Sequence, residues 1–237
     1  MNLMKKILLK LFLVSFILFC FTSCNNNTCE YYSSRGEKSF QQRKYDKAVV
    51  YYSKAIDCCS SKIELYYSRA ETYLYLKNYY LALQDINVVI NSDFSYQNAH
   101  LVRGIIYRNT LQYEKALDDF SYELRIHPQK SSVLLERSKL YSQTNNIQLA
   151  FDDVNNILMK DSLNTESLLH RARLYAELGN DSLSKNDLKK IKQITAKRQS
   201  NYDFIQKPSK STHSRKPTHL GGVFRLLGRL LKAVNKR

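Results

Sequence analysis

Glycine and proline are scarce in this sequence, and tryptophan is absent. The 237 residues include six Gly and three Pro, too few for the frequent tight turns of a β-sandwich or barrel. Hydrophobic residues make up 43% of the chain, enough for a sizeable core. These values favour an all-α protein of long helices joined by short turns. The length fits either one ordinary domain or an array of repeats with extensions.

Acidic residues are also few, with 21 Asp and Glu against 37 Lys and Arg. The excess of basic charge lies at the two ends of the chain. Residues 192–237 carry twelve basic and one acidic side chain, and the first ten residues add three lysines, so only +2 of the formal +16 remains for residues 11–191. A basic tail attached to a nearly neutral body is expected to meet anionic lipid, nucleic acid or an acidic protein.

Motifs of catalysis and cofactor binding are missing as well. The sequence has no glycine-rich phosphate loop, no Cys-x-x-Cys pair and no His-Glu-x-x-His helix. Its five histidines are scattered, and none has a carboxylate or cysteine at a recurring ligand spacing. We therefore expect a protein that is not an enzyme and has neither metal nor cofactor.

The N-terminus has the features of an export signal. Lys5, Lys6 and Lys10 precede an apolar run at 11–21, which is about half the length that spans a bilayer. A charged flank, a short apolar stretch and small residues after it are typical of signal peptides. An uncleaved anchor through residues 7–21, or plain secretion, are the alternatives. Each of them places the body outside the cytoplasm, so we expect no nucleic-acid partner.

The end of this segment, Phe21-Thr22-Ser23-Cys24, resembles a bacterial lipobox, with Phe in place of the usual Leu. The resemblance implies that a signal peptide, 1–23, is removed and that Cys24 is lipidated as the mature N-terminus. Residues 24–28 would then form a short linker. The expected location is the bacterial cell envelope, with the body held close to a membrane.

A repeat of 34 residues runs through the body of the chain. Small residues recur in two columns and large ones in a third, and tyrosines recur in part of the array. The first small column is Gly36, Ala70, Gly104, Ser138 and Ala172; the second is Ala48, Ala82, Ala116, Ala150 and Ser184; the large column is Tyr52, Ile86, Phe120, Val154 and Leu188; and the tyrosines are Tyr73, Tyr107, Tyr141 and Tyr175. Five copies without a slip in spacing predict stacked supersecondary units.

Each copy reads as two helices of about 12–15 residues with apolar side chains at a 3.6-residue period. Breaks at Asn78, Asn145-Asn146 and Gly179-Asn180 separate the two helices. The two small columns let the helices of a pair approach closely. Because no single pair buries its apolar faces, neighbouring pairs stack into a solenoid.

The pattern resembles the tetratricopeptide repeat family over about 29–198. One copy carries Gly104, Tyr107, Tyr113, Ala116, Phe120 and Pro128 together. The resemblance implies five repeats, at 29–61, 62–95, 96–129, 130–163 and 164–198, the first and last being degenerate. It also implies a right-handed superhelix whose concave groove is lined by the first helix of each pair.

A polar ladder has the same period. Arginines recur at Arg35, Arg69, Arg103, Arg137 and Arg171, and aspartates at Asp85, Asp119, Asp153 and Asp187, with Tyr51 in the first place. The ladder fits a ligand-binding stripe or, as we favour, ion pairs between packed helices. Pairing within a repeat leaves only Arg35 without a carboxylate. Pairing with the next repeat would leave Arg35, Arg69 and Asp187 without a partner. We therefore predict pairs within repeats.

By family analogy, the first helices supply candidates for a peptide-binding groove. The candidates are Glu64, Tyr67, Glu71, Tyr75, Leu101, Ile105, Arg108, Asn109, Leu135, Lys139, Leu169 and Arg173. The Lys and Asn set with which some members of the family clamp a peptide carboxylate is absent here. The surface is mixed, apolar in the middle with charges at both ends. It suits an extended or helical peptide, or else is a solvated face.

Three cysteines follow the export segment. Cys29 begins the first predicted helix, and Cys58 and Cys59 end the second. Antiparallel helices bring these ends together, so a disulfide from Cys29 to one of the pair is geometrically allowed. The alternative is three thiols.

The basic tail divides into a polar linker, 199–222, and an amphipathic segment, 223–237. Apolar residues of 223–237 share one helical face, and basic residues lie mainly off it. The segment includes Phe224, Arg225, Leu227, Arg229, Leu230, Leu231 and Lys232. It is expected to lie on an anionic membrane, to dock on an acidic partner, or to cap the last repeat.

The sequence thus favours a non-catalytic envelope lipoprotein, a repeat scaffold that binds a protein or peptide near a membrane. The main alternative is a peripheral membrane organiser that binds through its tail. An accessory subunit of a hydrolase, without an active site of its own, is a more distant one.

Overall fold

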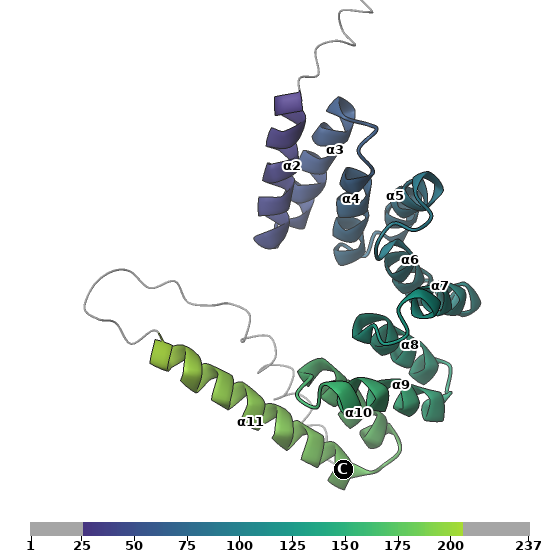
Figure 1. Cartoon of the computed structure of the whole chain (residues 1–237), viewed down its shortest axis with the longest axis vertical. Helices are drawn as coiled ribbons and strands as arrows, with labels where there is room; N and C mark the ends of the chain where they lie inside the picture. The colour runs from purple at the N-terminus through teal and green to yellow at the C-terminus, as the bar shows by residue number, and fades with distance from the viewer. Residues whose placement is uncertain (1–25, 206–237) are drawn as a thin grey trace, which may run out of the picture. The chain divides into compact units, whose positions relative to one another are not determined.

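The computed structural model describes residues 26–205 (Figure 1). Within that range the chain forms ten α-helices and no strand, which confirms the all-α prediction. The helices are α2 (Asn26–Gln41), α3 (Tyr45–Cys58), α4 (Ile63–Tyr75), α5 (Tyr79–Ser92), α6 (Ala99–Asn109), α7 (Tyr113–Ile126), α8 (Ser131–Gln143), α9 (Ile147–Lys160), α10 (Thr165–Glu177) and α11 (Asp181–Ile205).

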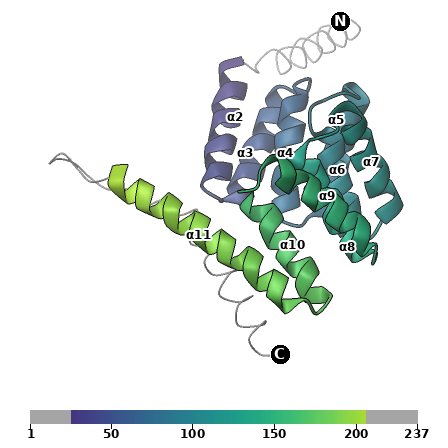
Figure 2. The same cartoon turned by 60° about the horizontal axis from the view of Figure 1, so that its bottom comes forward.

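The helices pair as the repeats predict. The chain divides into two compact units, Met1–Asp119 and Phe120–Arg237, and the boundary lies inside α7. In the first unit, α2 packs on α3 and α4 on α5; in the second, α8 packs on α9 and α10 on α11 (Figure 1 and Figure 2). Consecutive first helices also touch, α2 with α4 and α4 with α6 in the first unit, and α8 with α10 in the second.

The turn inside each pair has one residue with a left-handed backbone. Its φ lies between 59° and 72° in all five repeats, at Arg43, Lys77, Leu111, Asn145 and Gly179. The N–H of the following residue donates to a carbonyl five residues earlier, as from Asn78 to Tyr73 and from Gln112 to Tyr107, each at 2.9 Å. This bond satisfies an otherwise orphaned carbonyl at the helix end. The predicted break is therefore present even in the repeats where Arg, Lys or Leu occupies the strained position.

The predicted columns form the core. Every member of both small columns is buried, and so is every member of the large column. In the second unit the two small columns meet directly, because the Ser138 hydroxyl donates to the Ala150 carbonyl at 2.6 Å. Close approach at the small residues and filling by the large ones thus follow the physical expectation.

Two predicted boundaries differ from the structure. Helix α2 begins at Asn26, inside the predicted linker 24–28. Helix α11 continues to Ile205, beyond the predicted repeat end at 198 and into the predicted linker, because no Gly or Pro interrupts it before Pro208. The signal segment 1–23, Cys24 and the tail segment 223–237 lie outside the described residues. No helix within 26–205 is long and apolar enough to cross a bilayer.

Candidate peptide-binding surface

The ladder of arginines and aspartates is built from bidentate ion pairs within each repeat. Arg69 reaches Asp85 with Nε–Oδ2 and Nη2–Oδ1 distances of 2.7 and 2.8 Å. The other three pairs have the same arrangement, at distances of 2.7 to 2.9 Å: Arg103 with Asp119, Arg137 with Asp153, and Arg171 with Asp187. Their aspartates are almost fully buried. These ion pairs connect the two helices of each of these four repeats.

Three of the arginines also reach back to the preceding repeat. Nη1 of Arg69 donates to Ser53 at 2.9 Å, that of Arg103 to Asn87 at 3.3 Å, and that of Arg171 to Asn155 at 2.8 Å. Each of these three guanidiniums therefore links its own helix to two others. The sequence analysis did not predict this contact. A column of polar residues with the 34-residue period could have indicated it: Ser53, Asn87, Ser121 and Asn155. Arg35, which has no such aspartate, bonds the Tyr31 hydroxyl at 3.3 Å and is exposed.

Two buried histidines were also missed. The Nε2–H of His100 donates to the Phe94 carbonyl at 3.0 Å, and its Nδ1 forms a hydrogen bond with Asp119 at 2.8 Å. Nε2 of His170 lies 3.0 Å from the Ser138 hydroxyl. Burial, and the positive charge of Lys139, lower the pKa of His170 to about 4. Both rings thus belong to the packing of the repeats.

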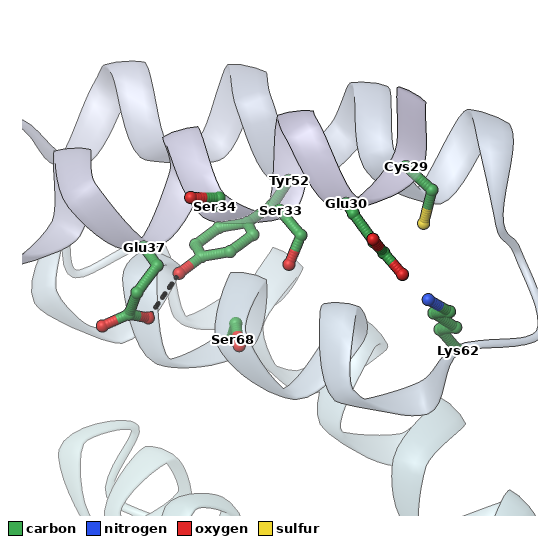
Figure 3. Close-up of a pocket in the computed structure, with 8 residues that line it drawn as sticks. All are labelled: Cys29, Glu30, Ser33, Ser34, Glu37, Tyr52, Lys62 and Ser68. Carbon is green, nitrogen blue, oxygen red and sulfur yellow. Dashed lines mark hydrogen bonds between the residues drawn. The ribbon is translucent and has the colours of Figure 1, made fainter. Parts of the chain in front are cut away.

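A pocket of about 350 Å³ opens between α2 and α4 in the first unit (Figure 3). Its lining combines acidic, hydroxyl and aromatic groups: Cys29, Glu30, Ser33, Ser34, Glu37, Tyr52, Lys62 and Ser68. The residues of α2 that contribute lie three and four positions apart, so they share one face of the helix. The Tyr52 ring, which reaches in from α3, forms the floor together with Ser68 of α4.

Two carboxylates of this region are held by tyrosine hydroxyls. The Tyr52 hydroxyl donates to Glu37 at 3.2 Å, and the Tyr67 hydroxyl donates to Glu71 at 3.2 Å. Burial raises the pKa of Glu71, the negative charge of Glu37 raises it further, and the bond from Tyr67 opposes the rise. Helices α2 and α4 therefore present neighbouring carboxylates, Glu37 and Glu71, on one surface.

Aromatic rings border these carboxylates on α4. The Tyr67 ring lies 5.3 Å from that of Tyr96. Tyr75 stacks on Tyr45 at 5.0 Å and meets Phe40 edge-on at 5.3 Å, while 60% of its surface stays exposed. Of the predicted groove residues, Tyr67, Glu71 and Tyr75 thus lie together on the surface of α4. Glu64, in the first turn of that helix, is also exposed.

Two predicted groove residues are instead part of the core. Leu101 is 9% exposed and Leu135 is 5% exposed, so a peptide could not reach either side chain. Each leucine lies on the inward side of its first helix, where apolar surface is removed from water. The prediction assigned them to the groove by family analogy and is wrong. Ile105 and Arg108 on α6 are half-buried, and the Asn109 amide donates to the Ile105 carbonyl at 2.8 Å.

In the second unit, the predicted groove residues mainly have internal partners. Lys139 bonds Glu136 at 2.6 Å and Glu166 at 3.1 Å. Leu169 packs against the core formed by α9, α10 and α11. Arg173 is half-buried on the same helix as Leu169. Among the predicted groove residues, the acidic ones, Glu64 and Glu71, therefore lie on α4.

The three cysteines lie together, as the ends of antiparallel helices should. Cys29 is buried, and Cys58 and Cys59 pack against the same cluster. The structure holds them as thiols, with no disulfide. Burial and a hydrogen bond with Cys59 raise the pKa of the Cys29 thiol to about 11.

The described residues contain no group of three or more His, Cys, Asp or Glu side chains arranged to hold a metal ion. The pocket residues are hydroxyls, carboxylates, one lysine and one thiol, which suit hydrogen bonding and charge pairing with another molecule. The arrangement can therefore bind a polar or charged group of another molecule.

No protein-family model matches the sequence, and no curated protein matches it either. Solved structures do resemble it. A tetratricopeptide repeat protein from Parabacteroides merdae ATCC 43184 aligns with 70% of this chain at 22% identity and a TM-score of 0.64. The match spans 64% of that protein, so this chain covers less than two thirds of its length.

Two further structures agree. A thermophilic tetratricopeptide repeat protein from Thermus thermophilus aligns over 73% of this chain and 97% of its own, at 18% identity and a TM-score of 0.62. YrrB, a tetratricopeptide repeat protein with an unusual peptide-binding site, aligns over 69% of this chain and 84% of its own, at 15% identity and a TM-score of 0.51. At these identities the likeness concerns the fold, and the predicted tetratricopeptide repeat fold is confirmed.

Proposed function

We propose that this chain is a non-catalytic scaffold that binds a protein or peptide on the surface formed by its first helices. The observation that carries the proposal is the pocket between α2 and α4, where the exposed carboxylates of Glu30 and Glu37 are open to a partner. The arginine ion pairs hold together the helix pairs of the second to fifth repeats. The solved protein YrrB, which shares the fold, has a peptide-binding site.

We further propose that the scaffold is a lipoprotein of the bacterial cell envelope, anchored through lipid on Cys24. Support comes from the basic, apolar and small residues of 1–24. Because α2 begins at Asn26, the first repeat would follow the lipidated residue almost directly. The binding surface of α2 and α4 would then lie close to the membrane.

A crosslinking pull-down from intact cells tests the binding role. Tyr67→Ala combined with Ile105→Ala removes side chains from the proposed surface on α4 and α6. Tyr80→Ala combined with Val88→Ala is a matched control, since both side chains are exposed on the second helix α5. We expect the first pair to abolish capture of a partner that the control pair retains. Equal capture by both would contradict the proposed surface.

A second candidate role is a peripheral membrane organiser, favoured by the apolar and basic pattern of 223–237. In that role the tail would add a second attachment beside the lipid, with about 1 kcal/mol from each basic residue near an anionic surface. Flotation of the unlipidated chain with anionic liposomes tests it. Flotation that disappears when 223–237 is deleted supports this role, and no flotation of the complete chain rejects it.

A further inference from the structure

The pocket between α2 and α4 has acidic groups without basic partners. Glu30 and Glu37 line it from α2, and Glu71 of α4 lies outside the lining but near enough to Glu37 to feel its charge. Within residues 26–205, none of the three is in an ion pair, whereas each ladder aspartate is paired with an arginine. Lys62 lies near Glu30 at one end of the pocket, so the end at Glu37 is the one that lacks a cation (Figure 3).

The carboxylates at the Glu37 end of the pocket have hydrogen-bond partners, but those partners carry no positive charge. Glu37 and Glu71 are fixed by the hydroxyls of Tyr52 and Tyr67, and hydroxyls carry no charge. The charge of Glu37 is felt at Glu71, so the two repel, and a cation between them would relieve that repulsion. Tyrosine rings at the same place can pack against the alkyl part of Lys or Arg.

The chain itself contains a segment of the required chemistry. Residues 207–237 have no Asp or Glu and nine basic side chains: Lys207, Lys210, Arg215, Lys216, Arg225, Arg229, Lys232, Lys236 and Arg237. We propose that this segment of one copy of the chain binds the acidic pocket between α2 and α4 of a second copy. The contact goes beyond the proposed binding of an external partner and competes for the same surface.

The other end of the array does not suit this segment. Helix α11 is exposed at Lys192, Lys197 and Arg198, and a small pocket beside it is lined by the last two of these. A basic segment laid over that surface would bring like charges together. Charge therefore favours α2 and α4 over a cap on the last repeat.

In this contact the segment comes from a second copy. The pocket belongs to the first repeat and the segment follows the fifth, so each copy can offer its pocket to one neighbour and its segment to another. Binding of the end of one copy to the start of another is a heterologous contact, which leaves a free pocket and a free segment at the two ends. Such contacts generate assemblies larger than a dimer.

Two measurements test the proposal on the chain from residue 24 onward, with Cys24→Ser to prevent lipidation. Sedimentation velocity follows self-association of the complete chain as its concentration rises. Fluorescence anisotropy follows binding of a labelled 207–237 peptide to the chain that ends at Gln206, whose fold is checked by circular dichroism. The acidic pocket is altered by Glu37→Gln with Glu71→Gln. The control, Glu114→Gln with Asp118→Asn, removes the same charge from exposed positions of α7.

We expect self-association of the complete chain, its loss when 207–237 is deleted, and weaker peptide binding at higher salt. The pocket variant should lower peptide affinity about tenfold, which corresponds to about 1.4 kcal/mol, and the control less than about twofold. Equal losses of peptide affinity in the pocket variant and the control would show that the peptide responds only to the net charge of the protein, and would overturn the proposal. So would a complete chain that stays monomeric at every concentration, or a segment that binds anionic vesicles but not the protein. Capture of an external partner is measured separately by the Tyr67 and Ile105 variants, so failure of the contact between copies would leave the proposed function standing.

Discussion

Arg103 on α6 and Asp119 on α7 face each other through two parallel hydrogen bonds, with Nε–Oδ2 and Nη2–Oδ1 distances of 2.9 and 2.8 Å. Asp119 also contacts His100, 2.8 Å away, and its side chain is 6% exposed. The guanidinium meanwhile bonds Asn87 of the preceding repeat. This cluster ties the second and third repeats together, and its aspartate has the most partners of the four in the ladder.

Asp119→Ala should therefore destabilise the protein strongly. The substitution leaves Arg103 and His100 without their shared acceptor in a mostly buried place, and loss of one partner of such a pair costs about 3 kcal/mol or more. Asp118→Ala, at the exposed neighbouring position, should change the free energy of unfolding by less than about 0.5 kcal/mol. Urea denaturation of both variants measures the difference. A loss under about 1 kcal/mol for Asp119→Ala would show that water screens the pair.

Leu111→Gly should stabilise the protein. Leu111 has φ of +62° and is 70% exposed, so its side chain adds strain at the turn and little packing. Glycine, which the fifth repeat has at this place, adopts that backbone without strain, and the expected gain is about 0.5–1 kcal/mol. The midpoint of urea unfolding should rise. Leu117→Gly, inside α7, should lower it, and a fall in both variants would contradict the interpretation of the turn.

The sequence predicted the fold from its period, because packing of repeated helix pairs needs the same residue sizes every 34 positions. The two small columns, the large column and the arginine pairs all follow from that requirement. Breaks inside the repeats were predicted only where Asn or Gly marks them, at Asn78, Asn145-Asn146 and Gly179-Asn180. The left-handed residues Arg43, Lys77 and Leu111 carry no such signal and are held there by the helix ends around them.

The candidate site was predicted less well. Tyr67, Glu71 and Tyr75 do lie together on α4, but Leu101 and Leu135 are buried. A 3.6-residue period shows which side of a helix faces the core, but it does not decide whether a residue at the edge of that side is buried or exposed. The pocket against α2 was missed, because it depends on the Tyr52 ring crossing from α3 to bond Glu37, a contact between residues fifteen apart.

Gly36→Ala tests the closest approach in the first repeat. A β-carbon at Gly36 would lie 2.7 Å from two atoms of the Tyr52 ring. The ring is 2% exposed and its hydroxyl is bonded to Glu37, so it has little room to move. We expect a loss of about 1–3 kcal/mol in the free energy of unfolding. Adding Tyr52→Leu should make the effect of Gly36→Ala smaller, as a double-mutant cycle would measure. An unchanged effect would show that the ring is not the obstacle.

His170 should make stability fall in mild acid. The Ser138 hydroxyl donates its proton to Ala150, so it accepts the Nε2–H of His170, while burial and Lys139 hold the pKa of the folded state at about 4, below its ordinary 6.5. As the pH falls from 6.5 towards 4, the unfolded chain binds a proton that the folded chain does not, and stability decreases. At pH 5 this linkage amounts to about 2 kcal/mol.

The measurement compares free energies of unfolding at pH 7 and pH 5 in the wild type, His170→Gln and His127→Gln. His127 is exposed in the same unit and serves as the matched control. Glutamine at 170 does not titrate, so that variant should lose about 2 kcal/mol less than the wild type between the two pH values, whatever its stability at pH 7. The His127 variant should follow the wild type. If all three proteins lost the same free energy of unfolding, the pKa of His170 would be equal in the folded and unfolded chains. The ring would then have to be in contact with water in the folded chain.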